Sequence, residues 1–504
     1  MLYPSLNEFK ALCGKGNLIP VYREILADMD TPVTAFLKLG GTPSFLLESV
    51  VGGEKWARYS FIGSRPSKVI MAWGKKVEIR EEGKPAVVFS SDDPLEVLNA
   101  EVSRYIPVEV RGIPRFFGGL VGYMGYDMVR FFERIPDKSG HGLGLPDMFF
   151  MLTDTMLIFD SLQQKIKVVS NAHIEGKNPD EAYREAEDKI GEIIERLNKT
   201  AVPAPSGSVE NKTQGVKNGK KGMNGPFTSS FGTKEAFKDA VAKAKEFVMA
   251  GDVVQVVLSQ RFERESSANP FNVYRALRVI NPSPYMYYLD TGEAKIVGSS
   301  PEILARLEGK TVVLRPIAGT RKRGETEAED KQLEEELKKD PKEIAEHIML
   351  VDLGRNDVGR VARTSSVKVT ELMSVERYSH VMHLVSHVEG ELREGLDAFD
   401  VLRASFPAGT VSGAPKVRSM EIIEELEPTR RGPYAGAVGY FSYSGNMDTC
   451  ITIRTLIIKD GKVYVQAGAG IVADSDPERE YMETVNKAKG MMKAVDMAEA
   501  GLDQ

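Results

Sequence analysis

Cysteine is nearly absent from this sequence. Only Cys13 and Cys450 occur among its 504 residues, and they lie far apart along the chain. A disulfide framework or a zinc site built from thiolates is therefore not expected. Neither cysteine lies in the glycine-flanked turn that a glutamine-hydrolysing thiol needs. Cys450 lies in an apolar stretch, where it would pack as a small hydrophobic residue.

Long apolar runs and an excess of basic residues are also missing. No stretch reaches the roughly 20 apolar residues of a membrane helix. The first residues, MLYPSLNEFK, lack the basic start and apolar core of a signal peptide. The net charge is −6, so no positive excess is available to neutralise phosphates. We therefore expect a cytoplasmic protein that has neither a membrane nor a nucleic acid as its partner.

Common phosphate-binding and nucleophile motifs are absent too. The stretch GVKNGKKG lacks the Ser or Thr that follows Lys in a Walker A loop, and GAGIVA does not complete a dinucleotide fingerprint. No serine lies in a nucleophile elbow. The chemistry must therefore be sought in other segments.

One polar segment divides the sequence. Residues 200–226 are rich in Gly, Pro, Ser, Asn and Lys and nearly free of large apolar residues. Such a composition cannot bury enough surface to offset the entropy of ordering, so a flexible linker or loop is predicted. The predicted organisation is an N-terminal domain over 1–199 and a C-terminal domain over 227–504.

Short β-rich stretches dominate both parts, with a few helices between them. Helices are predicted over 180–197 and over 233–250, the second with Thr233 as its N-cap. Lys459-Asp460-Gly461 is a hairpin signal. Strands that occur in runs favour an α+β fold with antiparallel sheets. The predicted strands include 44–50, 149–159, 252–261, 381–390 and 449–458.

Seven blocks combine glycine, proline and charged residues with flanking apolar strands, which is typical of loops that approach a ligand closely. In sequence and order, and over essentially all of 227–495, they resemble the chorismate-utilising enzyme family. The resemblance implies a complex sandwich of largely antiparallel sheets with helices outside, in two closely associated subdomains, and chorismate as the substrate. The blocks are GSSPEILARL, RPIAGTRKRG, AEHIMLVDLGRNDVGRV, ASFPAGTVSGAPKVRSMEII, GPYAGAVGYFS, DTCITIRTL and QAGAGIVADSDPEREYMETVNKAKG.

Two glutamates match the magnesium carboxylates of the family. These are Glu346 and Glu483, and Mg²⁺ typically keeps waters and takes only one or two protein carboxylates. The bound ion would neutralise the ring carboxylate of chorismate. From the residues alone, Glu483 could instead be an exposed partner of Lys487 four residues on. It borders a predicted apolar stripe that begins at Met482.

Glu343 leaves two interpretations open. It occupies the third position of a helix that Asp340 caps and Pro341 begins. It is either a capping-box glutamate that reaches back to Asp340 or a residue that supports the metal ligands.

Arg454 interrupts the apolar stretch ITIRTLII. A lone buried arginine is costly unless it is paired, and its planar guanidinium suits a carboxylate. An ion pair with a protein acid is the alternative. The resemblance implies that Arg454 binds the enolpyruvyl carboxylate. The other residues at substrate-contacting positions are Tyr434, the backbone of Gly468, Ala469 and Gly470, and Gly319, Thr320 and Thr410.

Two further residues match catalytic positions. Glu302 matches the general acid for the departing C4 hydroxyl, a role that requires a raised pKa such as burial supplies. The alternative is a surface carboxylate. His383 matches a histidine beside the ring that serves pyruvate elimination, and its alternative is a core histidine bonded within a sheet.

Two positions distinguish branches of the family. Ala318 lies where aminodeoxychorismate synthases carry a nucleophilic lysine, so direct attack by ammonia is favoured. Gln255 lies where the water-using branches carry a lysine base, and ammonia needs no such base. Both residues indicate the anthranilate synthase branch, which transfers an amine and eliminates pyruvate.

The N-terminal part adds a regulatory signature. FLLES (45–49) and NPSPYMYYL (281–289) resemble the paired segments that bind tryptophan as feedback inhibitor in that branch. Ser49, Pro284, Tyr285 and Met286 would contact the effector. The alternative is an ordinary strand and a strand-initiating turn.

The resemblance therefore implies conversion of chorismate and ammonia to anthranilate and pyruvate, with Mg²⁺ as cofactor and tryptophan as inhibitor. Without a glutaminase motif, ammonia would come from a separate glutamine amidotransferase subunit, in a heterotetramer, or from solution. One alternative is an aminodeoxychorismate synthase component, against which Ala318 argues. The other is a non-catalytic tryptophan-binding regulator, against which the intact set of Glu302, Glu346, Arg454 and Glu483 argues.

Overall fold

The computed structural model describes residues 1–50, 58–138, 140–200, 225–378 and 381–502. The predicted linker, apart from its ends, lies outside the described residues. Among the described residues, no helix is both long enough and apolar enough to cross a membrane.

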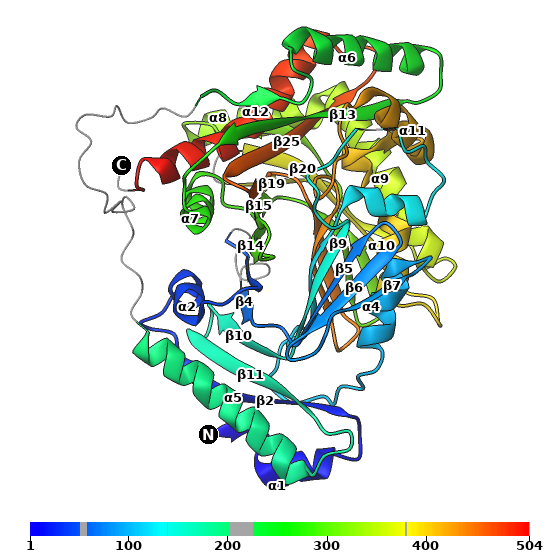
Figure 1. Ribbon diagram of the computed structural model, residues 1–504. Helices are drawn as coiled ribbons and strands as arrows, with labels where there is room; N and C mark the ends of the chain where they lie inside the picture. Colours follow the sequence, from blue (N-terminus) through cyan, green and yellow to red (C-terminus); the bar gives the residue numbers. More distant parts are fainter. Residues whose placement is uncertain (51–57, 139, 201–224, 379–380, 503–504) are drawn as a thin grey trace, which may run out of the picture.

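Two large sheets form the molecule, and every named strand pair in them is antiparallel, as predicted (Figure 1). The first sheet runs in the order β1 (Leu2–Tyr3), β2 (Leu18–Leu26), β11 (Lys165–His173), β10 (Thr155–Asp160), β4 (Tyr59–Ser64), β3 (Ser44–Glu48), β14 (Tyr285–Asp290), β15 (Lys295–Ser300), β24 (Thr455–Lys459), β25 (Lys462–Ile471), β13 (Gln255–Glu265) and β12 (Thr228–Ser229), with β21 (Gly413–Ala414) also paired to β13.

The second sheet runs in the order β18 (Ile317–Lys322), β20 (Val381–Glu391), β17 (Thr311–Leu314), β16 (Ile303–Glu308), β23 (Met447–Ile451), β22 (Ala437–Ser442), β8 (Gly119–Met124), β9 (Met148–Thr153), β5 (Lys68–Trp73), β6 (Lys76–Glu81) and β7 (Val87–Ser90), with β19 (Lys368–Arg377) paired to β20. Strands from both halves of the sequence lie in each sheet. They meet where β3 pairs with β14 and where β8 pairs with β22.

The two sheets enclose the larger core, and helices cover the outside. Phe45 and Tyr287 of the first sheet belong to the same buried cluster as Phe149 and Phe441 of the second. The outer helices are α1 (Leu6–Leu12), α2 (Pro32–Leu39), α4 (Pro94–Val102), α5 (Pro179–Lys199), α6 (Lys234–Met249), α7 (Pro270–Ile280), α8 (Glu327–Lys339), α9 (Pro341–Val361), α10 (Ala398–Ser405), α11 (Lys416–Leu426) and α12 (Pro477–Glu499). Figure 1 shows α5 lying along β2 and β11.

Several local predictions are confirmed. The predicted helices are α5 and α6, and the Thr233 hydroxyl accepts from the Ala236 N–H at 3.2 Å. Asp460 and Gly461 have φ of 50° and 74° and form the two-residue turn between β24 and β25. A turn of this kind requires positive φ, which Asp and Gly accept most easily.

Two long predicted strands were wrong in the same way. Residues 149–159 form β9 and β10, which lie in different sheets, and residues 449–458 form β23 and β24, which also lie in different sheets. The apolar pattern continues through each break because both strands are buried, so the pattern does not reveal where the chain crosses between sheets. Arg454 lies in the second crossing, in the left-handed region with φ 51°.

Candidate active site

A cavity of 140 Å³ collects most of the predicted substrate and catalytic residues. It lies where the two sheets meet α12. The predicted residues that line it are Glu302, Thr320, His383, Thr410, Tyr434, Arg454 and Gly468, together with Ala318. These residues come from segments up to 166 positions apart in the sequence, from Glu302 to Gly468. The fold therefore assembles one site from separate blocks.

Glu302 is buried in the wall of this cavity, with 5% of its surface exposed. The Thr410 hydroxyl donates to its Oε1 at 2.8 Å, and the Ile451 N–H donates to its backbone carbonyl at 3.0 Å. Burial raises the pKa of Glu302 to about 8, although the Thr410 hydrogen bond opposes that rise. The surface alternative is wrong, and the carboxyl group is protonated at neutral pH.

Arg454 brings a positive charge into the same cavity. Its Nη1 donates to the Lys487 carbonyl at 2.9 Å, and burial lowers the pKa of its guanidinium. Among the residues that the structure describes, no carboxylate lies within ion-pair distance of it. An unpaired buried cation is costly, so the site is suited to an anionic ligand.

His383 lies on β20 opposite Thr320 of β18. Its Nδ1 lies 2.9 Å from the Gly319 carbonyl and 3.0 Å from the Thr320 hydroxyl. Burial lowers the pKa of the imidazole, so it is neutral. A proton on Nδ1 satisfies the Gly319 carbonyl and leaves Nε2 as an acceptor. His383 is thus both bonded within the sheet and part of the cavity wall.

Three acidic side chains, Glu343, Glu346 and Glu483, lie close enough to interact electrostatically, and none of them is among the residues that line the cavity. Burial raises the pKa of Glu346, and the nearby carboxylates of Glu343 and Glu483 raise it further. Glu483 pairs with Lys487 at 2.7 Å, as its alternative interpretation predicted, and 47% of its side chain is exposed.

The helix that carries Glu346 begins as predicted, but Glu343 does not complete a capping box. Asp340 caps α9 by accepting from the N–H groups of Lys342 and Glu343 at 3.0 and 3.4 Å. The Glu343 carboxylate instead accepts from Arg321 at 3.1 Å. The predicted stripe on α12 is buried at Ala488 and Val495, but not at Met482, where it was predicted to begin. Met482 is 38% exposed, because the buried face of that helix runs through Thr484 and Ala488.

The carboxylates of Glu346 and Glu483 fit a hard divalent cation. Their mutual repulsion is what such an ion would relieve, and two carboxylates plus waters suffice for Mg²⁺. No cluster of three or more His, Cys, Asp or Glu side chains that could hold a metal occurs in the described parts of the chain. A tightly enclosed all-protein metal cage is therefore not the kind of site found there.

The predicted glycine segment lies on β25, which β24 accompanies only as far as Val465. Lys487 donates to the Gly468 carbonyl at 3.0 Å. Ala469 packs its methyl group into a neighbouring core. Gly470 is covered by Gln255, whose Nε2 lies 2.2 Å from where a Cβ would stand. Gln255 itself is buried beside the cavity and is not one of its lining residues.

Two polar lining residues were missed by sequence reasoning. Lys487 was considered only as the partner of Glu483, yet it lies one turn farther along α12 and reaches the cavity. Gln466 also lines the cavity. Its signal was available, since it is a single amide in the apolar stretch KVYVQAGAGI.

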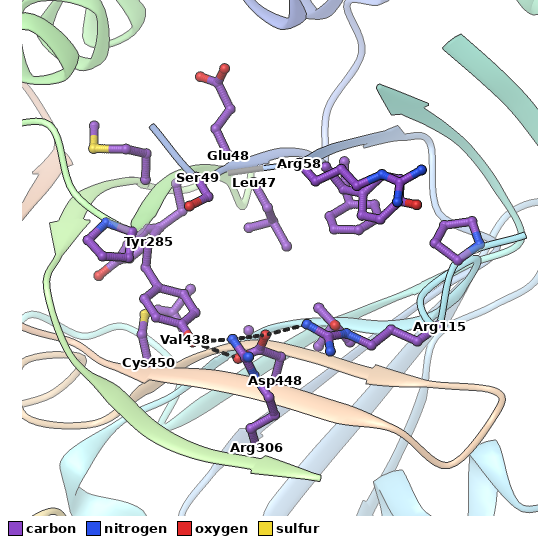
Figure 2. A pocket seen from close by; sticks show the side chains of 18 residues that line it. Leu47, Glu48, Ser49, Arg58, Arg115, Tyr285, Arg306, Val438, Asp448 and Cys450 are labelled. Carbon is purple, nitrogen blue, oxygen red and sulfur yellow. Dashed lines mark hydrogen bonds and ion pairs between the residues drawn. The ribbon is translucent and has the colours of Figure 1, made fainter. Parts of the chain in front are cut away.

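A second, larger pocket of 460 Å³ brings together the segments predicted to bind tryptophan (Figure 2). Strand β3 pairs with β14 so that Glu48 lies opposite Met286. The pocket lining therefore includes Ser49 together with Pro284, Tyr285 and Met286. The lining also includes Arg58, Arg115, Arg306, Tyr440, Asp448 and Cys450.

A polar network forms the floor of this second pocket. The Tyr285 hydroxyl donates to Asp448 at 2.8 Å and accepts from Arg306 at 3.0 Å. Arg306 also pairs with Asp448 at 2.8 Å. Figure 2 shows these three side chains converging below Ser49 and Leu47.

Comparison with known proteins gives one consistent result. A family model described as chorismate binding enzyme matches residues 44–493. Proteins named anthranilate synthase component 1 from Acetivibrio thermocellus and Aquifex aeolicus are 51% and 52% identical, and each alignment covers 99% of both chains.

Solved structures give the same answer. Anthranilate synthase component I from Streptococcus pneumoniae superposes with a TM-score of 0.75 at 38% identity, covering 93% of this chain and 98% of that one. The isochorismate synthase MenF from Escherichia coli superposes with a TM-score of 0.69 at 19% identity over 97% and 98% of the two chains, which shows a shared fold.

Proposed function

The chain belongs to the chorismate binding enzyme family, in its anthranilate synthase component 1 branch, and we propose that it converts chorismate and ammonia to anthranilate and pyruvate. It is a chorismate-converting enzyme of the lyase type. The observation that carries the proposed reaction is the pairing, in one cavity, of a buried protonated acid, Glu302, with a buried cation that lacks a carboxylate partner among the described residues, Arg454.

In the proposed mechanism, Arg454 and Lys487 bind substrate carboxylates, and Tyr434 orients the enolpyruvyl group. Magnesium held by Glu346 and Glu483 would neutralise the ring carboxylate. Ammonia attacks C2 while the ring double bonds shift, and Glu302 gives its proton to the C4 hydroxyl, which leaves as water. A raised pKa suits that step, because the acid must still hold its proton near neutral pH.

Elimination then completes the reaction. A base removes the proton from C2, the C3–O bond breaks, and the enolpyruvyl group leaves to become pyruvate as the ring becomes aromatic. We assign the base to Nε2 of His383, since its Nδ1 is engaged by the Gly319 carbonyl. Ala318 offers no amine to form a covalent ring adduct, which favours direct attack by ammonia and disfavours the aminodeoxychorismate synthase alternative.

We propose a separate glutamine amidotransferase subunit as the source of ammonia, in a cytoplasmic heterotetramer. The two thiols of this chain are poor candidates for glutamine hydrolysis. Burial raises the pKa of Cys450 and of Cys13, so neither is a thiolate at neutral pH.

We further propose that the 460 Å³ pocket binds tryptophan as a feedback inhibitor. It is large enough for an indole side chain, and its lining offers apolar side chains beside Ser49, Tyr285 and Asp448. In this proposal, tryptophan inhibits an active enzyme. The presence of Glu302, Glu346, Arg454 and Glu483 argues against a non-catalytic regulator.

A direct assay tests the proposal. The purified chain is incubated with chorismate, Mg²⁺ and ammonium at alkaline pH, with and without tryptophan, and anthranilate fluorescence and pyruvate are both measured. We expect equal amounts of the two products and inhibition by tryptophan. Chorismate consumption without pyruvate would indicate the aminodeoxychorismate reaction, and tryptophan binding without turnover would indicate a regulator.

A further inference from the structure

A buried ion pair lies directly behind the cavity wall. The side chains of Arg431 and Glu427 are 2% and 3% exposed. They meet in a two-bond fork, with Arg431 Nε donating to Glu427 Oε2 at 2.9 Å and Nη2 donating to Oε1 at 2.6 Å. Burying two charges costs much of what their attraction returns. Stability alone is therefore a weak reason for this pair.

The other two hydrogen bonds of Arg431 go to the cavity wall. Nη1 donates to the Val411 carbonyl at 2.6 Å, and Nη2 donates to the Val257 carbonyl at 2.8 Å. Both valines line the cavity. Val411 directly follows Thr410, the donor to Glu302, in the 3₁₀ turn η2 (Gly409–Val411). One guanidinium thus fixes this turn relative to β13.

Glu427 is linked to the cavity through Ser259. Its Oε1 accepts from the N–H and the hydroxyl of Ser259 at 2.7 and 2.9 Å. Gln466, which lines the cavity, donates to the same Ser259 hydroxyl at 2.9 Å. Every side-chain bond that the pair makes to the rest of the described protein therefore ends on a cavity residue or on Ser259, one bond away.

Arg431 also supports an aromatic side chain of the site. Its guanidinium carbon lies 5.7 Å from the ring centre of Tyr434 and 4.7 Å from that of Tyr126. Such cation–π contacts strengthen when both partners are desolvated. Tyr434 is thus held between the buried cation and the cavity.

We propose that Arg431 and Glu427 are positioning residues for the chorismate reaction. The pair does not line the cavity, but it holds Thr410, Tyr434 and Gln466 in the arrangement that the reaction requires. This inference rests on the proposed function. An apolar pair of similar volume would fill the same space, yet it would leave two carbonyls and the Ser259 N–H without their partner.

The test compares Arg431→Met, Arg431→Lys and Glu427→Gln in the full chain. A displacement of about 1 Å in a catalytic group costs on the order of 100-fold in rate. We expect kcat/KM for chorismate consumption to fall about 100-fold in Arg431→Met and less in Arg431→Lys, which keeps the charge but loses the fork. Glu427→Gln, the isosteric change, should lie between wild type and Arg431→Met.

Glu101→Gln is the matched control. Glu101 is a 4% exposed carboxylate that pairs with Lys68 at 2.5 Å, away from the cavity. The Glu101→Gln substitution should lower the melting temperature while leaving kcat/KM per folded molecule unchanged. The folded fraction of each variant is measured by thermal unfolding and circular dichroism. Arg431 variants that lose melting temperature but keep kcat/KM per folded molecule would overturn the proposal.

A binding measurement separates this inference from the proposed function. Calorimetry gives the Kd of chorismate for wild type and Arg431→Met without any turnover. We expect Kd to rise about tenfold or more, because Tyr434 and Gln466 lose their support. If the wild-type chain makes no anthranilate, the proposed function fails. The ratio of the Kd values of Arg431→Met and wild type still decides the role of the pair. An unchanged Kd together with unchanged kcat/KM would refute it.

Discussion

Ile303 and Cys450 lie opposite each other in the paired strands β16 and β23, and they join the two pockets. Cys450 lines the 460 Å³ pocket, whereas Ile303 directly follows Glu302 in the wall of the catalytic cavity. The chain also runs from Cys450 to Arg454 within four residues. A ligand in the larger pocket therefore lies close to β16, which begins directly after Glu302, and to β23, which ends three residues before Arg454.

Replacing Ser49 by Phe tests that the larger pocket binds tryptophan. The phenyl ring would occupy pocket volume beside Tyr285, so tryptophan should bind at least about tenfold more weakly, which corresponds to roughly 1.4 kcal/mol. Activity without tryptophan should be nearly unchanged, because Ser49 does not line the catalytic cavity. The measurement is anthranilate formation over a tryptophan titration.

The control for this prediction changes a residue outside both pockets. Val279→Phe adds a ring at a site that is already 68% exposed, and it should leave the tryptophan titration as in wild type. If Ser49→Phe and Val279→Phe give the same inhibition curve as wild type, the effector lies elsewhere.

Glu302→Gln should lower activity, but it should not lose stability with rising pH as wild type does. The amide cannot give a proton to the leaving hydroxyl, so turnover should fall by about 100-fold or more. The folded pKa of about 8 lies above the ordinary value of 4.5, so Glu302 favours folding when protonated. That contribution is complete below pH 4.5 and is lost as pH rises toward 8.

The stability of wild type should therefore fall relative to Glu302→Gln as pH increases. The difference is expected to reach at most about 5 kcal/mol near pH 8, which is an upper bound for a pKa shift of this size. Thermal unfolding of both proteins between pH 5 and pH 9 measures it. A constant difference across that range would mean that Glu302 is not titrating as a buried acid.

Some elements of the fold could be predicted from the sequence, and others could not. The antiparallel sheets, α5, α6 and the Asp460-Gly461 turn followed from periodicity and turn chemistry, because these depend on neighbours in the chain, whereas the sandwich was implied by the family resemblance. The crossings at Asp154 and Arg454 did not, because a buried strand has the same apolar pattern in either sheet. The position of Arg454 in its crossing is a product of tertiary structure alone.

The candidate site likewise contains residues that could be predicted from the sequence and residues that could not. The resemblance supplied Glu302, His383 and Arg454 as substrate neighbours, and the fold places all three at one cavity. Arg431 and Glu427 were not predicted, since nothing in the local sequence shows that a charged pair four residues apart is buried. Only the packing of β13, η2 and β25 around them reveals it.

Glu346→Gln should weaken the binding of magnesium more than it affects folding. The substitution removes one of two candidate ligands and also relieves the repulsion from Glu343 and Glu483 that raises the pKa of Glu346. The Mg²⁺ concentration for half-maximal activity should rise at least about tenfold. The melting temperature without metal should stay level or increase. A titration with Mg²⁺ after chelation of all metal measures the first effect, and an unchanged midpoint would exclude Glu346 as a ligand.

Ala318→Lys should change the chemistry at the cavity. Ala318 lines the cavity on β18, so a lysine there would place its amine near the substrate ring. We expect anthranilate formation to fall by about tenfold or more, because the new amine competes with ammonia for C2. If the amine attacks, the C4 hydroxyl leaves as water, and the protein gains the mass of chorismate minus water. Intact-protein mass spectrometry detects that adduct.

Ala318→Met is the matched control for the lysine variant, since it has a similar length but no nucleophile. It should reduce activity by crowding the cavity, with no adduct at any chorismate concentration. An adduct in Ala318→Lys alone would show that position 318 faces the reacting carbon, and that alanine leaves that carbon open to ammonia. Equal losses in both variants without an adduct would place the amine away from C2. In that case Ala318 would contribute only space, and the preference for ammonia would have to come from other residues, with Gln466 in the wall and the buried Gln255 beside Gly470 as the amides to test.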